Sequence, residues 1–143
     1  MAADTTKSLD GIGSGTLPDQ GIDSESATDI DLGIDLGTTR TVVARADRGN
    51  YPVISFTDEH GDEHDFIPSL TALHEGVLIH GFAARQAAHQ GAPLLRSLKR
   101  VLASPTLTAS TPVRLGDRTF SVLEVLTSYL RHLEAELTER GID

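Results

Sequence analysis

Residues 33–39, Gly-Ile-Asp-Leu-Gly-Thr-Thr, combine a carboxylate, a glycine and two hydroxyl groups in a pattern suited to binding phosphate. Apolar residues alternate before and within this segment, at Ile30, Leu32, Ile34 and Leu36. This period of two predicts a strand with one face toward a core and with Asp35 on the opposite face. Gly37 permits a positive φ, so the chain can turn sharply while its backbone N–H groups converge on an anion.

A β-type composition resumes directly after this turn, at residues 41–44. The two runs predict a hairpin whose tip holds phosphate, built without the lysine loop of the Walker type. Asp35 could instead cap the turn through an Asx hydrogen bond. The Gly-Thr-Thr that follows favours ligand binding over this alternative.

The segments after the hairpin predict an antiparallel meander. Polar or glycine-containing turns separate three expected strands, which cover residues 51–57, 69–73 and 77–79. Pro68 should lie at the first residue of its strand or on a sheet edge, because proline cannot donate to a central ladder.

The composition becomes helical after Gly81. It predicts a helix over residues 82–90 and a short second helix over 94–102, followed by a small hairpin over 113–120. Ser121 and Glu124 form a capping box for a last helix, and Phe120 is placed to pack onto Val125. That helix carries an apolar stripe, composed of Val122, Val125, Leu126, Tyr129, Leu130, Leu133 and Leu137.

The overall composition limits the function classes. The chain has 143 residues, enough for one modest domain, and a formal net charge of −9. Clustered basic residues and cysteine are both absent, which argues against a nucleic-acid surface and excludes a thiolate zinc site. No apolar stretch approaches the roughly 20 residues that cross a bilayer. The amino-terminal segment also lacks the features of a secretory signal, so we expect a cytoplasmic protein with no membrane partner.

We divide the chain into a leader, residues 1–28, and a domain, residues 29–143. Seven acidic residues and one lysine within residues 1–31 supply −6 of the net charge. The leader has neither aromatic residues nor a helical or strand period, so we expect a disordered acidic tail and assign it no function. The chain stops soon after the last helix, whose stripe therefore either marks an unfinished domain or docks on the preceding strands.

The 33–39 segment resembles the first phosphate motif of the actin-like ATPase superfamily, in particular the nucleotide-binding domain of the heat-shock protein 70 chaperones. Later segments resemble that family in order and spacing, namely Phe-Ile-Pro-Ser at 66–69, the glycine, alanine and Gln-Ala positions at 81–87, and Leu-Lys-Arg-Val-Leu at 98–102. The resemblance covers roughly residues 32–143. It implies an α/β fold, the amino-terminal β-meander and helices of a partial actin-like ATPase (ribonuclease H-like) domain.

The resemblance also implies roles for single residues. Asp35 matches the aspartate that holds a magnesium ion, largely through its water shell. Lys99 matches the lysine that reaches the γ-phosphate of ATP and helps place the attacking water, so Asp35 and Lys99 are the expected catalytic residues. The turn that binds the β- and γ-phosphates corresponds to Gly37, Thr38, Thr39 and Arg40.

In that family, ATP binding and hydrolysis switch the affinity of a separate domain for unfolded client polypeptides. A J-domain co-chaperone and a nucleotide-exchange factor drive the cycle. The resemblance therefore implies a chaperone of protein folding and the stress response, with ATP and magnesium as cofactors. The family's second phosphate loop, its further carboxylates, its adenosine-binding segment and its peptide-binding domain would follow Asp143. We therefore expect this chain alone to hydrolyse ATP weakly or not at all.

Two details depart from the family pattern. Arg40 stands where the family more often has an uncharged residue, and its cation would either tighten phosphate binding or block the turn. Ala103 replaces the glycine that usually follows Leu102, which is a minor difference.

Two other functions remain open. A sugar-kinase-like phosphotransferase needs a sugar-binding aspartate and an aromatic platform soon after the first hairpin, where only Tyr51 and Phe56 occur. A non-catalytic interaction module would keep the hairpin for packing and use the last helix for docking.

Two further clusters of polar residues have simpler interpretations. The His-Gly-Asp-Glu-His string at 60–64 predicts a solvated loop rather than a metal site, because Gly61 argues against the helix that its spacing would need. Arg96 and Arg100 are interpreted as the exposed face of a short helix.

Overall fold

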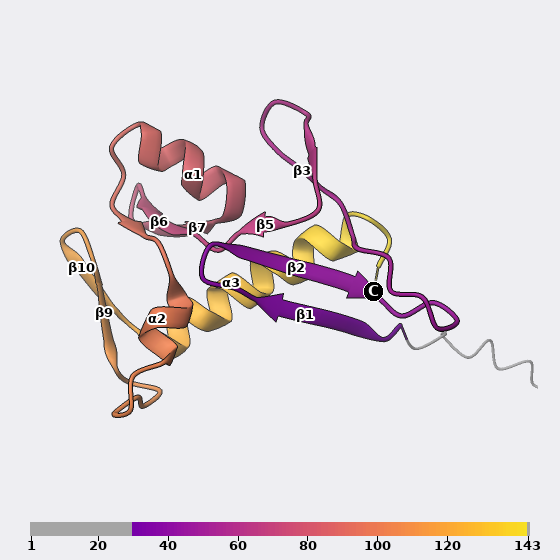
Figure 1. The fold of residues 1–143 in the computed structure, drawn as a ribbon. Helices are drawn as coiled ribbons and strands as arrows, with labels where there is room; N and C mark the ends of the chain where they lie inside the picture. Colours follow the sequence, from indigo (N-terminus) through magenta and orange to yellow (C-terminus); the bar gives the residue numbers. More distant parts are fainter. Residues whose placement is uncertain (1–29, 143) are drawn as a thin grey trace, which may run out of the picture.

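The structure is a computed structural model that describes residues 30–142 (Figure 1). The expected leader, residues 1–28, lies outside the described residues. Within them the chain forms three helices and ten short strands, so the fold is of mixed α/β type. All strand pairs are antiparallel.

The predicted first hairpin is confirmed. β1 (Leu32–Leu36) pairs with β2 (Arg40–Arg45), and β5 (Ile67–Pro68) pairs with the start of β2, giving the order β1-β2-β5. Pro68 therefore lies on an edge strand, as predicted. Leu32 and Leu36 pack against the core, but Ile34 between them is 49 % exposed. The prediction that the whole apolar face of β1 meets a core is wrong at Ile34, which no described segment covers.

The expected single meander is instead a set of small sheets. β3 (Phe56–Thr57) pairs with β4 (Glu63–His64), and β6 (Thr71–His74) lies between β7 (Val77–His80) and β8 (Leu94–Leu95). The expected strand at 51–57 shrinks to its last two residues and an isolated bridge between Val53 and Ala44. Pro52 explains the interruption, because it has no N–H to donate to a ladder.

Two other element boundaries differ from expectation. Ser69 and Leu70 form the link between β5 and β6 rather than the start of a strand, with the Ser69 amide donating to the carbonyl of Thr39. Leu94 and Leu95 pair with β6 instead of opening a helix, so α2 covers only Leu98–Leu102. The spacing of Leu94 and Leu95 cannot distinguish a strand from a helix, because a half-buried pair of leucines suits either element.

The remaining elements follow the sequence closely. α1 (Gly81–His89) begins directly after β7, and β9 (Pro112–Leu115) pairs with β10 (Arg118–Ser121). α3 (Val122–Thr138) starts at the predicted capping box, in which the Ser121 and Glu124 side chains each accept from the other residue's backbone N–H. Phe120 packs against the buried cluster that contains Val125, as the predicted hydrophobic staple requires.

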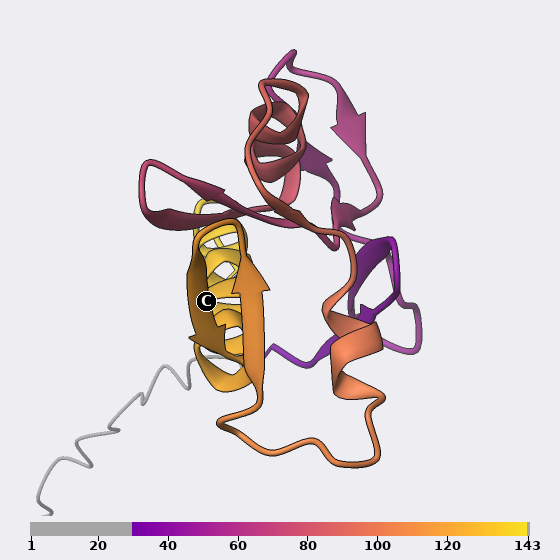
Figure 2. The same cartoon turned by 90° about the vertical axis from the view of Figure 1, so that its left-hand side faces the viewer.

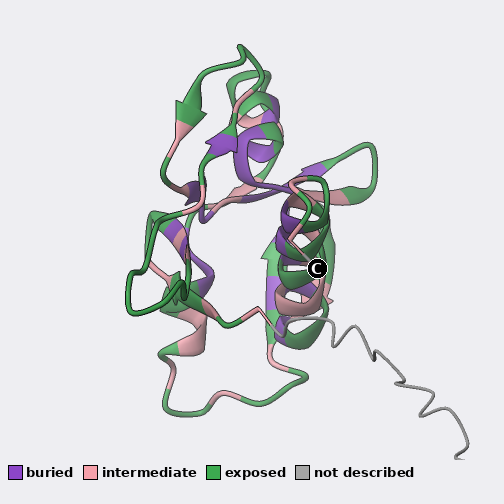
Figure 3. Ribbon diagram, turned by 90° about the vertical axis from the view of Figure 1, so that its right-hand side faces the viewer, coloured by how far each residue is buried: buried purple, intermediate pink, exposed green. Residues whose placement is uncertain are grey.

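α3 contributes to two buried clusters. Figure 2 shows β9 and β10 beside α3, and Figure 3 shows buried residues along the helix. Its first turns contribute Val122 and Val125 to a cluster with β9 and α2 residues. Its later turns contribute Tyr129, Leu133 and Leu137 to a cluster with residues of β2, β3, β5 and α1. The last helix thus packs on the preceding strands, and the expectation of an unfinished domain stays a prediction.

Buried polar groups fix the strands to this helix. The Tyr129 hydroxyl lies 2.7 Å from the Thr41 hydroxyl, which in turn lies 2.9 Å from that of Ser69. The His80 ring bonds the Thr71 hydroxyl at 2.9 Å through Nδ1 and the Ser128 hydroxyl at 2.7 Å through Nε2. Burial, with a smaller contribution from His132, lowers the pKa of His80 to about 4, so this histidine is neutral near pH 7.

Replacing Tyr129 with phenylalanine tests the first of these contacts. The substitution keeps the buried ring but deprives Thr41 of one hydroxyl partner, so we expect a loss of about 1–2 kcal/mol of unfolding free energy. Tyr51→Phe is the matched control, because Tyr51 is 71 % exposed and the chain has only two tyrosines. Urea denaturation of both variants gives the comparison; equal midpoints would contradict a stabilising hydroxyl pair.

His80 also predicts a pH dependence of stability. Its folded-state pKa lies below the unfolded value, so protons bind preferentially to the unfolded chain. The stability that a neutral His80 contributes is therefore fully present above about pH 6.5 and is lost as the pH drops toward 4, by up to about 1.4 kcal/mol per pH unit. His80→Gln should flatten that slope. Urea midpoints measured from pH 7 to pH 4 test this, and an unaltered slope in His80→Gln would exclude His80 as its source.

Candidate functional site

The turn between β1 and β2 needs glycine at position 37 for a reason other than the one predicted. Gly37 is not among the glycines with positive φ. Its N–H donates to the Arg40 carbonyl at 2.9 Å, and a Cβ at this position would lie 2.4 Å from that oxygen. The expectation of a positive φ is therefore wrong: glycine is required because the Arg40 carbonyl passes too close for any side chain.

The same contact changes which amides are available to an anion. The Gly37 N–H is already used inside the hairpin. Within residues 30–142, the N–H groups of Thr38 and Thr39 have no hydrogen-bond partner, and both residues are exposed. The Thr39 carbonyl accepts from the Ser69 amide at 3.0 Å, which anchors the turn to the link between β5 and β6. The donors offered by this rigid turn are thus two adjacent threonine amides and their hydroxyl groups.

The turn faces α2 across a pocket. Figures 1 and 2 show α2 beside the tip of the β1–β2 hairpin. A pocket of about 350 Å³ lies there, lined by Thr38, Thr39, Leu70, Arg96, Ser97 and Arg100. The Ser97 hydroxyl accepts from the Arg100 amide at 3.3 Å and caps α2. Two segments far apart in the sequence therefore combine hydroxyl groups, free amides and two guanidinium groups around one space.

Arg96 and Arg100 are the site residues that the sequence interpretation missed. Both are exposed, as predicted for the solvent-exposed face of a short helix, but both also line the pocket. The available signal was a pair of arginines on either side of the cap residue Ser97. Only the packing of α2 against the hairpin shows that they lie beside Thr38 and Thr39.

The two expected catalytic residues are not brought together at this pocket. Lys99 is exposed on α2 but is not a lining residue, and Asp35 is exposed on β1 opposite Val42. No group of three or more potential metal ligands occurs among the described residues. A magnesium ion held through water by one carboxylate does not require such a group.

Arg40 does not occupy the turn. Its guanidinium carbon lies 4.6 Å from the centre of the Phe66 ring, in a cation–π contact. The side chain is thus directed toward the region of β4 and β5. Of the two effects considered for this cation, blocking of the turn does not occur.

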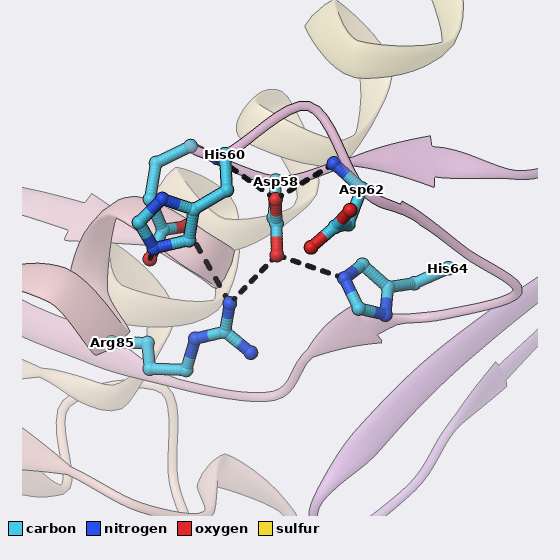
Figure 4. Close-up of polar contacts among 6 residues, drawn as sticks. Asp58, His60, Asp62, His64 and Arg85 are labelled. Atoms are coloured by element: carbon cyan, nitrogen blue, oxygen red, sulfur yellow. Dashed lines mark hydrogen bonds and ion pairs between the residues drawn. The ribbon is translucent and has the colours of Figure 1, made fainter.

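A second polar cluster surrounds Asp58 (Figure 4). One carboxylate oxygen accepts from the amides of His60 at 2.9 Å and Asp62 at 3.1 Å. The other lies 2.9 Å from His64 Nε2 and 3.2 Å from an Arg85 nitrogen. The bond from His64, followed by the backbone bonds and that from Arg85, holds the pKa of Asp58 well below its usual range despite the opposing effect of burial.

The solvated-loop interpretation of residues 60–64 is confirmed at 60–63, which are exposed, but not at His64, which is half-buried. The Asp58 side chain is only 5 % exposed, and the His64 ring packs between Phe66 and Phe82, with centroid distances of 5.4 and 5.0 Å. Every polar group of Asp58 is bonded within the loop or to α1. These contacts fasten the β3–β4 loop to α1.

Neither a protein-family model nor a curated protein sequence matches this chain. Within residues 30–142, no helix combines the length and apolar character needed to cross a membrane.

Gly37→Ala tests the close approach in the turn. A Cβ at 2.4 Å from the Arg40 carbonyl forces the hairpin to shift, so we expect a loss of about 1–3 kcal/mol. Gly33→Ala in β1 is the control, because its Cβ would lie 4.0 Å from the nearest atom, the Ala44 carbonyl oxygen. Urea midpoints and amide exchange of β2 report the outcome; a Gly37→Ala variant as stable as Gly33→Ala would disprove the steric requirement.

Proposed function

We propose that this chain binds the phosphate groups of magnesium nucleotide, ATP in particular, at the pocket between the 37–39 turn and α2. In this proposal it acts as the amino-terminal part of the nucleotide-binding domain of a heat-shock protein 70-like chaperone. One observation carries it: the two segments that resemble that family's phosphate motif and Lys-Arg motif meet at a single pocket. Nothing in their separate sequences requires this meeting.

The chemistry of the pocket suits a polyphosphate. The free amides of Thr38 and Thr39 and their hydroxyl groups supply donors from one side, where the hairpin holds them in fixed positions. Arg96 and Arg100 supply guanidinium groups from the other, and such groups bind phosphate oxygens through paired, charge-assisted hydrogen bonds. Magnesium, when bound, neutralises phosphate charge, and Asp35 is the residue proposed to hold its water shell.

The same geometry favours binding over turnover. Lys99 lies outside the pocket, so no lysine is positioned there to orient an attacking water. We therefore propose that nucleotide hydrolysis by this chain alone is weak or absent. In the complete chaperone cycle, client polypeptides, a J-domain co-chaperone and a nucleotide-exchange factor would act through parts of the family's architecture that follow these segments.

The positions of Tyr51 and Phe56 give little support to the sugar-kinase alternative. Phe56 is completely buried in the core, and Tyr51 is exposed next to the turn at residues 47–50. Neither residue lines the pocket, so neither provides a platform for a sugar ring beside the proposed phosphate site.

Titration of the chain with ATP and magnesium tests the proposed site. We expect Arg96→Gln combined with Arg100→Gln to weaken binding at least tenfold, because a hydrogen bond to a charged group contributes about 1.5–3 kcal/mol. The control of equal charge is Arg45→Gln combined with Arg48→Gln, two exposed arginines that do not line the pocket. Lys99→Gln should weaken binding less than the pocket pair does.

Calorimetry gives the affinities, and amide exchange at Thr38 and Thr39 locates the ligand. Absence of both heat and protection would exclude the nucleotide proposal and favour an interaction module. Magnesium-dependent ATP hydrolysis that Lys99→Ala abolishes would show instead that the chain is catalytically sufficient.

A further inference from the structure

Three buried hydroxyl groups meet next to the turn that carries the proposed phosphate site. They belong to Thr41 in β2, Ser69 in the link between β5 and β6, and Tyr129 in α3, all of which are buried. The Thr41 hydroxyl is the central one, 2.9 Å from that of Ser69 and 2.7 Å from that of Tyr129. Three segments that are distant in the chain thus converge on one side chain.

Core packing alone does not require a hydroxyl group at position 41. Thr41 and Val43 lie on the same face of β2 and are both 0 % exposed, so an aliphatic side chain suits that face. A buried hydroxyl group lowers stability unless it is hydrogen-bonded, and a network in which every member is bonded fixes one geometry of the segments that carry it. The three hydroxyl groups therefore set the position of β2 relative to the link and to α3.

Ser69 holds the chain at two points where it leaves the turn. Its N–H donates to the Thr39 carbonyl at 3.0 Å, and its hydroxyl bonds that of Thr41. At the start of the turn, the Gly37 N–H is bonded within the hairpin. The free N–H groups of Thr38 and Thr39 lie in sequence between these two anchors, the Gly37 N–H and the Thr39 carbonyl. The directions of both free groups consequently depend on Ser69.

We propose that Thr41, Ser69 and Tyr129 are positioning residues for phosphate binding, which hold the free N–H groups of the turn in one arrangement beside the pocket. This inference rests on the proposed function. The three residues are not part of the pocket lining, so they act through Thr39 and not on the ligand. Donors that are already held in place bind an anion more tightly, because the ligand does not have to order them.

Calorimetric titration of Thr41 variants with ATP and magnesium tests this role. Thr41→Val keeps the shape of the buried side chain but removes the central hydroxyl group. We expect it to weaken binding about tenfold, because the apparent affinity falls with the fraction of chains whose turn has the binding geometry. Thr41→Ser keeps the hydroxyl group and loses only a methyl group, so its affinity should stay within about twofold of that of the unsubstituted chain.

Ser128→Ala is the matched control for a lost buried contact. The Ser128 hydroxyl lies on α3, one residue before Tyr129, and bonds Nε2 of His80 at 2.7 Å. Its removal deletes a side-chain hydrogen bond of the same helix, but this bond leads to β7 and not to the turn. We therefore expect the affinity for ATP to be unchanged in Ser128→Ala.

Backbone order parameters of the free chain provide a readout that needs no ligand. Thr41→Val should lower the order parameters of the Thr38 and Thr39 N–H groups, whereas Ser128→Ala should leave them unchanged. Ser69→Ala is a milder variant for the case that Thr41→Val does not fold. It removes one of the two hydroxyl partners of Thr41, and we expect about a threefold loss of affinity.

Three results would overturn the inference. They are an affinity for ATP that Thr41→Val and Ser69→Ala leave unchanged, an equal loss of affinity in Ser128→Ala, and an equal loss in Thr41→Ser. Failure of the unsubstituted chain to bind ATP would overturn the proposed phosphate site itself, and this inference with it. Titration of the unsubstituted chain therefore distinguishes failure of the proposed function from failure of the positioning role alone.

Discussion

Burial of one face of α3 is the constraint on which the rest of the structure depends. The sheets contain few strands and could not be stable alone, because a two-stranded ribbon buries too little apolar surface. α3 provides the common surface: its first turns hold β9 and α2, and its later turns hold β2, β3, β5 and α1. Tyr129 adds a buried hydrogen bond at the centre of the helix, between its hydroxyl and that of Thr41 in β2. Thr41 lies two residues after Thr39 of the hairpin turn. Through this hydrogen bond α3 therefore also fixes the position of the candidate site.

The pocket follows from this arrangement. The turn is shaped by the close approach of Gly37 to the Arg40 carbonyl, and the Ser69 amide holds its other side. α2 is too short to be stable by itself and is held through Leu98, which is buried in the cluster shared with α3. Arg96 and Arg100 consequently lie beside Thr38 and Thr39. The site combines a rigid turn with two flexible cationic side chains, an arrangement suited to binding an anion more than to orienting a reaction.

β1 and α3 together line an apolar groove of about 560 Å³. The apolar residues Ile34 and Leu130 remain partly exposed there. Elsewhere the large apolar residues of α3 are mostly buried.

The sequence alone determined the elements whose signals are local. The first hairpin, the turn before β7, the capping box at Ser121 and the stripe of α3 all arise from contacts within a few residues, so spacing and residue type predict them. Tertiary structure decided the rest. Pairing with β6 made Leu94 and Leu95 a strand, and packing of α2 beside the turn put Arg96 and Arg100, rather than Lys99, at the pocket. The close approach of the Arg40 carbonyl, not a positive φ, required Gly37. Such outcomes depend on contacts between segments distant in the chain, which residue spacing does not encode.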